Sequence, residues 1–439
     1  MSAGYTAKDI LSLQVAPALG CTEPVAVALA AAAAASLLPG EGFDSLAVRV
    51  DANVYKNGLA VTIPGSEGLQ GLDTAAALGA LGGDPALRLE VLRGLGPETV
   101  HAAREALGAG RVAVDILPDT HGLTIEAVLT RGERSAACTI TRLHDNITGL
   151  AVDGAPLAKH PLLRAPGPEG NDRLAELEAW LKERTLPELL ALLDGLDDDD
   201  LAFLREGVER NLALARHGLK HGPGLGIGRG LERLVRQGLL KRDMALAARM
   251  LASAASDARM AGVNLPAMSS AGSGNHGLTA ILPIVAVMDF ITATERDMLE
   301  SIALSHMVTA YVKAHTGRLS AVCGCSVAAG AGAAAGTAHL LGGTAGQIAG
   351  AIKNLIADLA GVICDGAKAG CSLKLATAAG SAVLAALFSL QGINVLDTDG
   401  IVGATSEQTM RNMGEISTLG MMETDRVVLD IMIKKRLAG

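Results

Sequence analysis

The chain has 439 residues and a formal net charge of −9, with 37 Lys and Arg against 46 Asp and Glu. This length is enough for two or three domains with buried cores, and the acidic balance argues against a nucleic-acid or anionic-membrane partner. The aromatic residues are only one Trp, three Tyr and four Phe. They are too few for a base-stacking surface or a large aromatic pocket, so we expect a small, polar ligand.

Apolar runs in the sequence are too short or too interrupted to predict a membrane span or an export signal. Residues 25–38 form the longest run, which is shorter than the roughly 18 residues that a span needs. It follows Glu23 and Pro24 rather than a basic segment. We therefore expect a cytoplasmic protein, whose six cysteines stay reduced and are available for metal binding or catalysis.

Short β-branched runs separated by turns are typical of the first third of the chain. They predict strands at residues 45–51, 59–63, 112–116, 123–129 and 136–142, and helices at 71–81 and 97–107. Residues 51–58 and 64–68 read as polar turns beside these strands. The pattern predicts an N-terminal helix and a mixed α/β domain with a largely antiparallel sheet over residues 1–160.

A Pro/Gly-rich stretch at residues 157–170 is the predicted linker, and the pattern after it is helical. The acidic run at 197–200 reads as the cap of a helix rather than a metal site. The glycine-dense run at 221–230 fits neither a dinucleotide fingerprint nor a P-loop, and reads as a connection. From Met244 onward, Ala and Gly recur at three- and four-residue spacing. This predicts an all-α bundle over residues 161–439, and hence an α+β chain.

Four of the six cysteines, Cys323, Cys325, Cys364 and Cys371, fall within the last 120 residues. On a continuous helix the last two would lie about 10.5 Å apart along the axis, too far for one compact centre. Gly366 and Gly370 lie between them and favour a loop that could bring both sulfurs together. The spacing matches neither ferredoxins nor zinc ribbons, so a shared metal site and buried inert thiols both stay open.

Two further segments carry residues suited to chemistry. The loop at 268–277 combines Ser, Gly and Asn just before an apolar helix expected near Leu278. Backbone N–H groups at a helix start attract a carboxylate, although a capping loop without ligand is the alternative. Cys21 precedes an alanine-rich helix, where a thiol has a lowered pKa and can act as base or nucleophile. Cys138 lies within a predicted strand and reads as a core thiol.

Together these segments resemble the L-cysteine desulfidase family. The motifs that carry the resemblance lie at residues 20–24, 53–57, 63–65, 270–275 and 364–371, and they span essentially the whole chain. These oxygen-sensitive iron–sulfur enzymes are related to the iron–sulfur L-serine dehydratase alpha chain, which matches only the C-terminal half. Serine dehydratase-like proteins of unknown function belong to the same group.

The resemblance implies a lyase of amino-acid catabolism that uses a [4Fe–4S] cluster with one open iron. Its reaction would be β-elimination of L-cysteine to pyruvate, ammonia and sulfide, without pyridoxal phosphate. L-serine ammonia-lyase activity on the same scaffold and a non-enzymatic cluster-binding protein are the alternatives. The implied partner is a small amino-acid substrate, with no nucleic acid and no membrane, and a homodimer is compatible with it.

The resemblance also implies roles for individual residues. The cluster ligands would be Cys323, Cys364 and Cys371, with Cys325 able to take the place of the first. The base would be Cys21, with His276 and Lys368 as alternatives. Residues expected to bind substrate are Ser269, Ser270, Gly272, Ser273, Gly274 and Asn275, together with Asn53, Tyr55, Lys56 and Asn57 from the N-terminal part.

Overall fold

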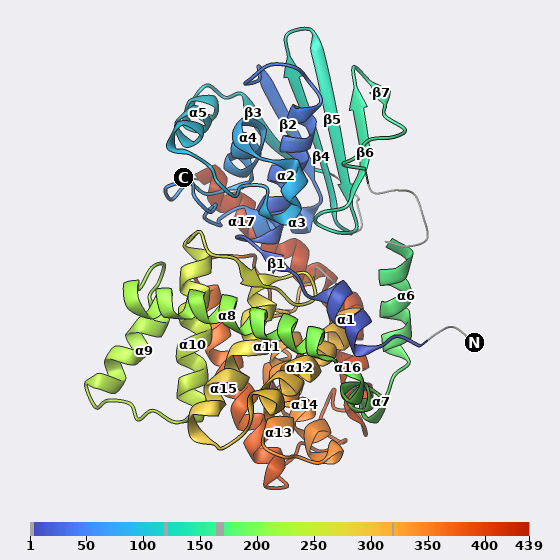
Figure 1. Cartoon of the computed structure of the whole chain (residues 1–439), viewed down its shortest axis with the longest axis vertical. Coiled ribbons are helices and arrows are strands. Elements are labelled where there is room, and N and C mark those ends of the chain that lie inside the picture. The colour runs from blue at the N-terminus through green and yellow to red at the C-terminus, as the bar shows by residue number, and fades with distance from the viewer. Residues whose placement is uncertain (1–3, 118–121, 164–170, 318–319, 439) are drawn as a thin grey trace.

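The computed structural model describes residues 4–117, 122–163, 171–317 and 320–438. It has a sheet-containing part above a helical part (Figure 1). The strands are β1 (Pro17–Ala18), β2 (Ser45–Val50), β3 (Val112–Ile116), β4 (Thr124–Arg131), β5 (Arg134–Thr141), β6 (Ile147–Val152), β7 (Ala155–Pro156) and β8 (Ala267–Met268).

The helices follow in chain order, with four short 3₁₀ or π segments between them. The α-helices are α1 (Ala7–Gln14), α2 (Thr22–Ser36), α3 (Ala52–Gly58), α4 (Leu72–Gly82), α5 (Pro97–Gly108), α6 (Asn171–Lys182), α7 (Leu186–Ala191), α8 (Asp198–His221), α9 (Ile227–Arg236), α10 (Met244–Met260), α11 (Gly274–Val287), α12 (Glu295–Thr316), α13 (Ala328–Leu340), α14 (Ala345–Leu359), α15 (Cys371–Leu390), α16 (Ser406–Glu415) and α17 (Met422–Ala438). The short segments are η1 (Pro85–Glu90), η2 (Leu192–Gly195), η3 (Met288–Phe290) and η4 (Ile416–Gly420).

A six-stranded sheet forms the centre of the N-terminal part, in the order β3-β2-β4-β5-β6-β7. β2 and β3 are parallel, and the other neighbouring strands are antiparallel. The predicted α+β class with a mostly antiparallel sheet is therefore confirmed. Alternate side chains of β2, Leu46, Val48 and Val50, are buried, as a strand with one covered face requires.

The alanine-rich helix α2 lies between this sheet and α4. Val25–Ala34 are all buried, which explains why this helix has no polar face. Its small side chains let α4 approach closely, since a Cβ added to Gly79 would lie 2.2 Å from the carbonyl oxygen of Ala28. The apolar run at residues 25–38 is thus a core helix of the N-terminal part.

Two predictions for the N-terminal part are wrong, and β6 was not predicted. Residues 59–63 are not a strand, because within the described residues only Thr62 forms an isolated bridge, to Gln70. Residues 51–58 are not a turn but contain α3. The Asp51 carboxylate caps this helix by accepting hydrogen bonds from the N–H groups of Asn53 and Val54 at 2.9 and 3.2 Å.

The predicted helical C-terminal region is confirmed. The acidic run at 197–200 caps α8, where Asp197 and Asp200 form a capping box. Half of the predicted linker, residues 164–170, lies outside the described part of the chain. The boundary expected between residues 160 and 161 falls between β7 and α6, and as a domain boundary it stays a prediction.

Helix α15 corrects the expectation that no segment could span a membrane. It is long and apolar enough by length and composition, although 56% of its apolar window is buried. It packs against α10, α13 and α14, as the core helix of a helical bundle does.

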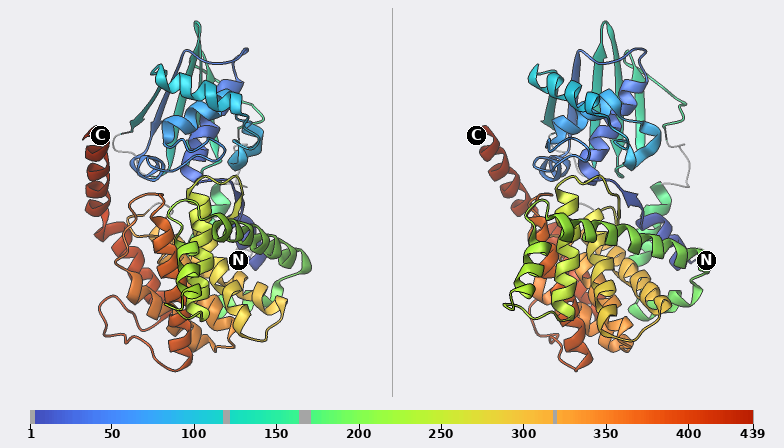
Figure 2. Two further views of the ribbon diagram at one scale, coloured as in Figure 1. Left: turned by 90° about the vertical axis from the view of Figure 1, so that its left-hand side faces the viewer. Right: turned by 60° about the vertical axis from the view of Figure 1, so that its left-hand side comes forward.

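Both chain ends connect the two parts of the molecule. α1 contacts α12, and β1 pairs antiparallel with β8, so the segment before Cys21 is anchored in the helical part. The C-terminal helix α17 extends away from the helical part toward the sheet-containing part, as Figure 2 shows. There Asp425 forms an ion pair with Lys56 of α3, whose side chain is only 1% exposed.

Asp425→Asn is expected to destabilise the protein, because it leaves the buried Lys56 ammonium without its counter-charge. The cost should be about 3 kcal/mol, the scale for breaking a buried ion pair, and it should appear as a lower denaturation midpoint. Glu423→Gln is the matched control, since Glu423 pairs with Arg426 on the surface of the same helix. That pair should contribute less than about 1 kcal/mol. Equal losses in the two variants would contradict a role for the Lys56 pair.

Candidate active site

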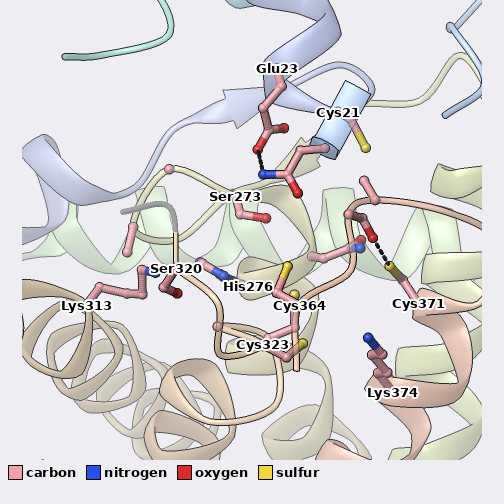
Figure 3. Close-up of a pocket in the computed structure, with 18 of the residues that line it drawn as sticks. Cys21, Glu23, Ser273, His276, Lys313, Ser320, Cys323, Cys364, Cys371 and Lys374 are labelled. Atoms are coloured by element: carbon pink, nitrogen blue, oxygen red, sulfur yellow. Dashed lines mark hydrogen bonds between the residues drawn. The ribbon is translucent and has the colours of Figure 1, made fainter. Parts of the chain in front are cut away.

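A cavity of about 80 Å³ lies where the helical part meets α3 and the start of α2 (Figure 3). It is far smaller than the roughly 300–1,000 Å³ of pockets for drug-sized ligands. The side chains around it are almost all polar or sulfur-containing. The charged and thiol residues of its wall are Cys21, Glu23, His144, Arg259, His276, Lys313, Cys323, Cys325, Cys364, Cys371 and Lys374.

Backbone pairing brings two of the cysteine segments together. The Cys323 N–H donates to the carbonyl of Val362 at 2.8 Å, and the Cys364 N–H donates to that of Ala321 at 2.6 Å. The hairpin of α13 and α14 lies between these two segments in the chain. The return of this helical hairpin therefore places Cys323 beside Cys364.

The predicted loop between Cys364 and Cys371 is present. It ends where α15 begins, at Cys371, whose thiol donates to the carbonyl of Gly366 at 3.7 Å. Gly366 has a φ of +88°, and a Cβ there would lie 2.3 Å from the carbonyl oxygen of Lys56. Glycine is thus required for α3 to pack directly on the cysteine loop.

Gly324 separates Cys323 and Cys325, and both of these cysteines reach the cavity. A Cβ on Gly324 would lie 2.4 Å from Nε2 of His276, so a larger residue would displace the histidine. Cys325 donates a hydrogen bond to the Cys323 sulfur, which lowers the pKa of Cys323. Cys138 lies in β5 and is buried in the core, as predicted.

The donor set suits a cluster of several irons. All six cysteines are free thiols, and five of them line one cavity. Among the described residues, no three His, Cys, Asp or Glu side chains are grouped closely enough to hold a single metal ion. Sulfurs that bind an iron–sulfur cluster stand farther apart, because each one binds a different iron. The residues therefore fit a cluster and do not fit a mononuclear zinc site.

Three cations surround the thiols and make the cavity attractive to anions. Arg259, at the end of α10, is 4% exposed and donates to Asn275 Oδ1 at 2.9 Å and to the Gly20 carbonyl at 2.6 Å. It thereby ties the segment before Cys21 to the start of α11. Lys313 of α12 is 5% exposed, and Lys374 of α15 is half-buried. Buried cations of this kind stabilise thiolates and carboxylates.

Cys21 is the N-cap residue of α2, but its pKa differs from the expectation. Burial raises the pKa of the Cys21 thiol to about 12, and the opposing effect of Arg259 is smaller. The prediction of a lowered pKa is therefore wrong for the substrate-free protein. The reason is that the free-energy cost of desolvating a fully enclosed thiolate exceeds the stabilisation that the helix N-terminus and the guanidinium group provide.

The two other candidate bases are placed differently. His276 lies in the cavity, and its Nδ1 donates to the Ser270 carbonyl at 3.1 Å, which leaves Nε2 as an acceptor. Burial and the neighbouring Lys313 lower the pKa of His276 to about 3, so it is neutral. Lys368 is outside the cavity wall and forms an ion pair with Asp365.

The loop before α11 is only partly turned toward the cavity. Gly272, Ser273 and Asn275 line the wall, and Ser273 makes no capping hydrogen bond with its side chain. The others face away from the cavity. Ser269 donates to the Ala16 carbonyl, Ser270 bonds to Nδ1 of His306, and Gly274 packs against Arg259. α11 begins at Gly274, four residues before the predicted start, so its first N–H groups belong to the cavity region.

Of the four residues expected from the N-terminal part, only Asn57 lines the cavity. It donates through Nδ2 to Oε1 of Glu23 at 3.2 Å. Asn53, Tyr55 and Lys56 are absent from the wall, because α3 presents a single residue to it. Lys56 instead forms the buried ion pair with Asp425.

Several cavity residues were missed in the sequence. Glu23 lies inside the motif at residues 20–24, so that motif could have identified it as a site residue. Arg259 and Lys313 are charged residues within otherwise buried helix faces, which is itself an indication of a site. His144, from the turn between β5 and β6, and Lys374 carried no comparable signal.

His306, whose Nδ1 bonds to Ser270 Oγ in the loop at 268–277, is expected to make the protein sensitive to acid. Burial lowers its pKa to about 4, whereas the unfolded chain binds a proton near pH 6.5. Stability should therefore fall as the pH decreases from about 6.5 to 4, because only the unfolded state takes up this proton. His306→Gln should reduce this fall in midpoint temperature, measured by calorimetry. The exposed His101→Gln is the control and should keep the wild-type pH dependence. If the midpoint temperature of His306→Gln depends on pH as strongly as that of the wild type, His306 is not the source of the acid sensitivity.

Comparison with known proteins finds relatives that match most of this chain. The family described as serine dehydratase alpha chain matches residues 122–430, which include Cys323, Cys364 and Cys371 but not Cys21. A UPF0597 protein of Desulfatibacillum aliphaticivorans is 61% identical over 99% of both chains, and one of Desulfotalea psychrophila is 58% identical over 99% of this chain and 100% of its own. One of Clostridioides difficile is 45% identical over 97% and 98%. The chain therefore belongs to the serine dehydratase alpha chain family.

Proposed function

We propose that the protein is an iron–sulfur L-cysteine desulfidase, which converts L-cysteine to pyruvate, ammonia and sulfide. The observation that carries this proposal is the convergence of Cys323, Cys364 and Cys371 with Cys21 on one small, cation-rich cavity. Family membership supports the general class of enzyme, a lyase of the iron–sulfur dehydratase type. The resemblance of the motifs to L-cysteine desulfidases supports the specific activity on L-cysteine.

The three cysteines would hold a [4Fe–4S] cluster. Cys323 and Cys364 are neighbours through their backbone hydrogen bonds, and Cys371 closes the same loop. When bound, the cluster would supply an iron that acts as a Lewis acid toward the leaving group on the β-carbon. Burial raises the pKa of the Cys364 thiol, and the nearby cations Lys56 and Lys374 oppose that rise.

The wall of the cavity offers separate places for the two charged ends of an amino acid. The substrate carboxylate would lie at the start of α11, near Ser273 and the buried Arg259, where the free N–H groups of a helix meet a cation. The ammonium group would face Glu23, which Asn57 orients by a hydrogen bond. This arrangement would direct the α-carbon toward Cys21.

Cys21 would remove the α-proton as a thiolate. A thiolate with a high pKa is a strong base, which suits the weakly acidic α-proton of an amino acid, but only a small fraction is ionised at neutral pH. Arg259 is the neighbouring cation that favours ionisation. Loss of the β-substituent then leaves aminoacrylate, which tautomerises and hydrolyses to pyruvate and ammonia.

L-serine ammonia-lyase activity is the second candidate, because the matching family is described as serine dehydratase alpha chain. The same residues would place L-serine and remove its α-proton. The two functions differ in the leaving group, hydroxyl against thiol. Parallel assays for pyruvate with both amino acids, and for sulfide with L-cysteine, distinguish them.

Anaerobic purification tests the proposal directly. The protein should contain iron and sulfide, absorb visible light as a cluster does, and release sulfide and pyruvate in equal amounts from L-cysteine. Chelation of the iron should abolish both products. Pyruvate from L-serine alone would replace the desulfidase assignment by the dehydratase one. A protein that binds a cluster but acts on neither amino acid would support a non-enzymatic role.

Cys21→Ala should retain the cluster spectrum and lose activity, because it removes the base but no cluster ligand. The expected loss in kcat is about 10²–10⁴-fold, the usual contribution of a positioned base. In the wild type, kcat/KM should rise from pH 7 to 9, since the thiolate fraction increases toward the raised pKa of Cys21. His276→Gln is the comparison variant. If it loses the pH dependence while Cys21→Ala keeps it, the base has been assigned to the wrong residue.

A further inference from the structure

The cavity holds one more thiol than the proposed cluster and the proposed base together need. Cys325 lines the same wall as Cys323, Cys364 and Cys371, and it is partly exposed where Cys323 is buried. Only Gly324 separates Cys325 from Cys323, and the backbone hydrogen bonds from Cys323 to Val362 and from Cys364 to Ala321 hold the Cys364 segment beside this turn. Cys325 therefore lies on the same cavity wall as all three proposed ligands.

The turn that carries Cys325 is tightly defined. The N–H groups of Ser326 and Val327 both donate to the Cys323 carbonyl, at 3.0 and 2.9 Å, and Ala329 N–H donates to Gly324 at 2.9 Å. This turn leads directly into α13, so Cys325 cannot move far from the cavity. A tethered thiol in this position has a high effective concentration at any iron that lacks a protein ligand.

We propose that Cys325 is the fourth cysteine ligand of the cluster in the substrate-free protein, and that the substrate thiol takes its place. This inference rests on the proposed function. In the exchange, Cys325 would release its iron, and the substrate sulfur would take its place as the ligand. The proton of the substrate thiol passes to the released Cys325 thiolate, so the charge in the buried cavity does not change.

The physical advantage of such a ligand is protection of the cluster. An iron with three inorganic sulfides and no protein ligand is the one most easily lost to oxygen or chelators. A cysteine that occupies it until substrate arrives limits that loss. The substrate would then need a thiolate to compete with Cys325, which favours L-cysteine over L-serine.

The test compares anaerobically reconstituted wild type, Cys325→Ala and Cys325→Ser during exposure to air. Loss of one iron is followed by electron paramagnetic resonance of the resulting [3Fe–4S] form and by iron analysis. Cys325→Ala should assemble the cluster but lose this iron roughly tenfold faster, since perturbing even an outer-shell partner weakens metal binding by this scale. Cys325→Ser, which keeps an oxygen ligand, should lose this iron at a rate between those of the wild type and Cys325→Ala.

Two controls make the outcome specific. Cys138→Ala removes a buried thiol of the sheet and should behave as wild type, whereas Cys323→Ala should fail to assemble the cluster. Equal rates of iron loss in wild type and Cys325→Ala would overturn the inference while leaving the proposed function intact. So would a cluster that needs Cys325 and forms without Cys323. A wild type that takes up no iron and sulfide would overturn the proposed function, and this inference with it.

Discussion

Close contact between helix backbones is the constraint on which this structure depends. With so few aromatic residues, the core combines aliphatic side chains with helices that approach closely through Gly and Ala. A Cβ on Gly218 of α8 would lie 1.9 Å from the Ala254 carbonyl of α10, and one on Gly332 of α13 only 2.3 Å from the Ser305 carbonyl of α12. Because the helices are this close, the short loops at their ends converge. The cavity lies where those loops meet.

Electrostatics in the cavity follow from burial. Thiols, histidines and cations are enclosed together, so small differences in their neighbours decide their charge. His276 and His306 are held neutral by desolvation, while Cys323 is favoured as thiolate by the hydrogen bond from Cys325. At Cys21 the helix N-terminus and Arg259 favour the thiolate, but burial outweighs both. The same enclosure that would protect a cluster thus makes the proposed base hard to ionise.

The sheet-containing part of the molecule completes the cavity. α3 presents Asn57 to it and packs on the cysteine loop at Gly366, and the turn between β5 and β6 contributes His144. The pairing of β1 with β8 holds the segment before Cys21 against the start of the loop at 268–277. α17 reaches back to Lys56 from the far end of the chain. Residues separated by several hundred positions therefore share one site.

Local patterns in the sequence determined the class of the fold, most helices and strands, and the thiols available for a cluster. Alternation, capping residues and the Gly pair around the loop at 364–371 act within a few residues, so they can be read without a structure. The strand predicted at 59–63 is wrong because the burial of Val61 and Ile63 is a tertiary effect, whereas the Asp51 cap of α3 is local and was overlooked in the sequence. The tertiary structure alone decided which polar residues face the cavity. Ser270 and Lys368 turn away, whereas Arg259, Lys313 and His144 turn inward, because that choice depends on contacts between distant segments and on desolvation, neither of which is local.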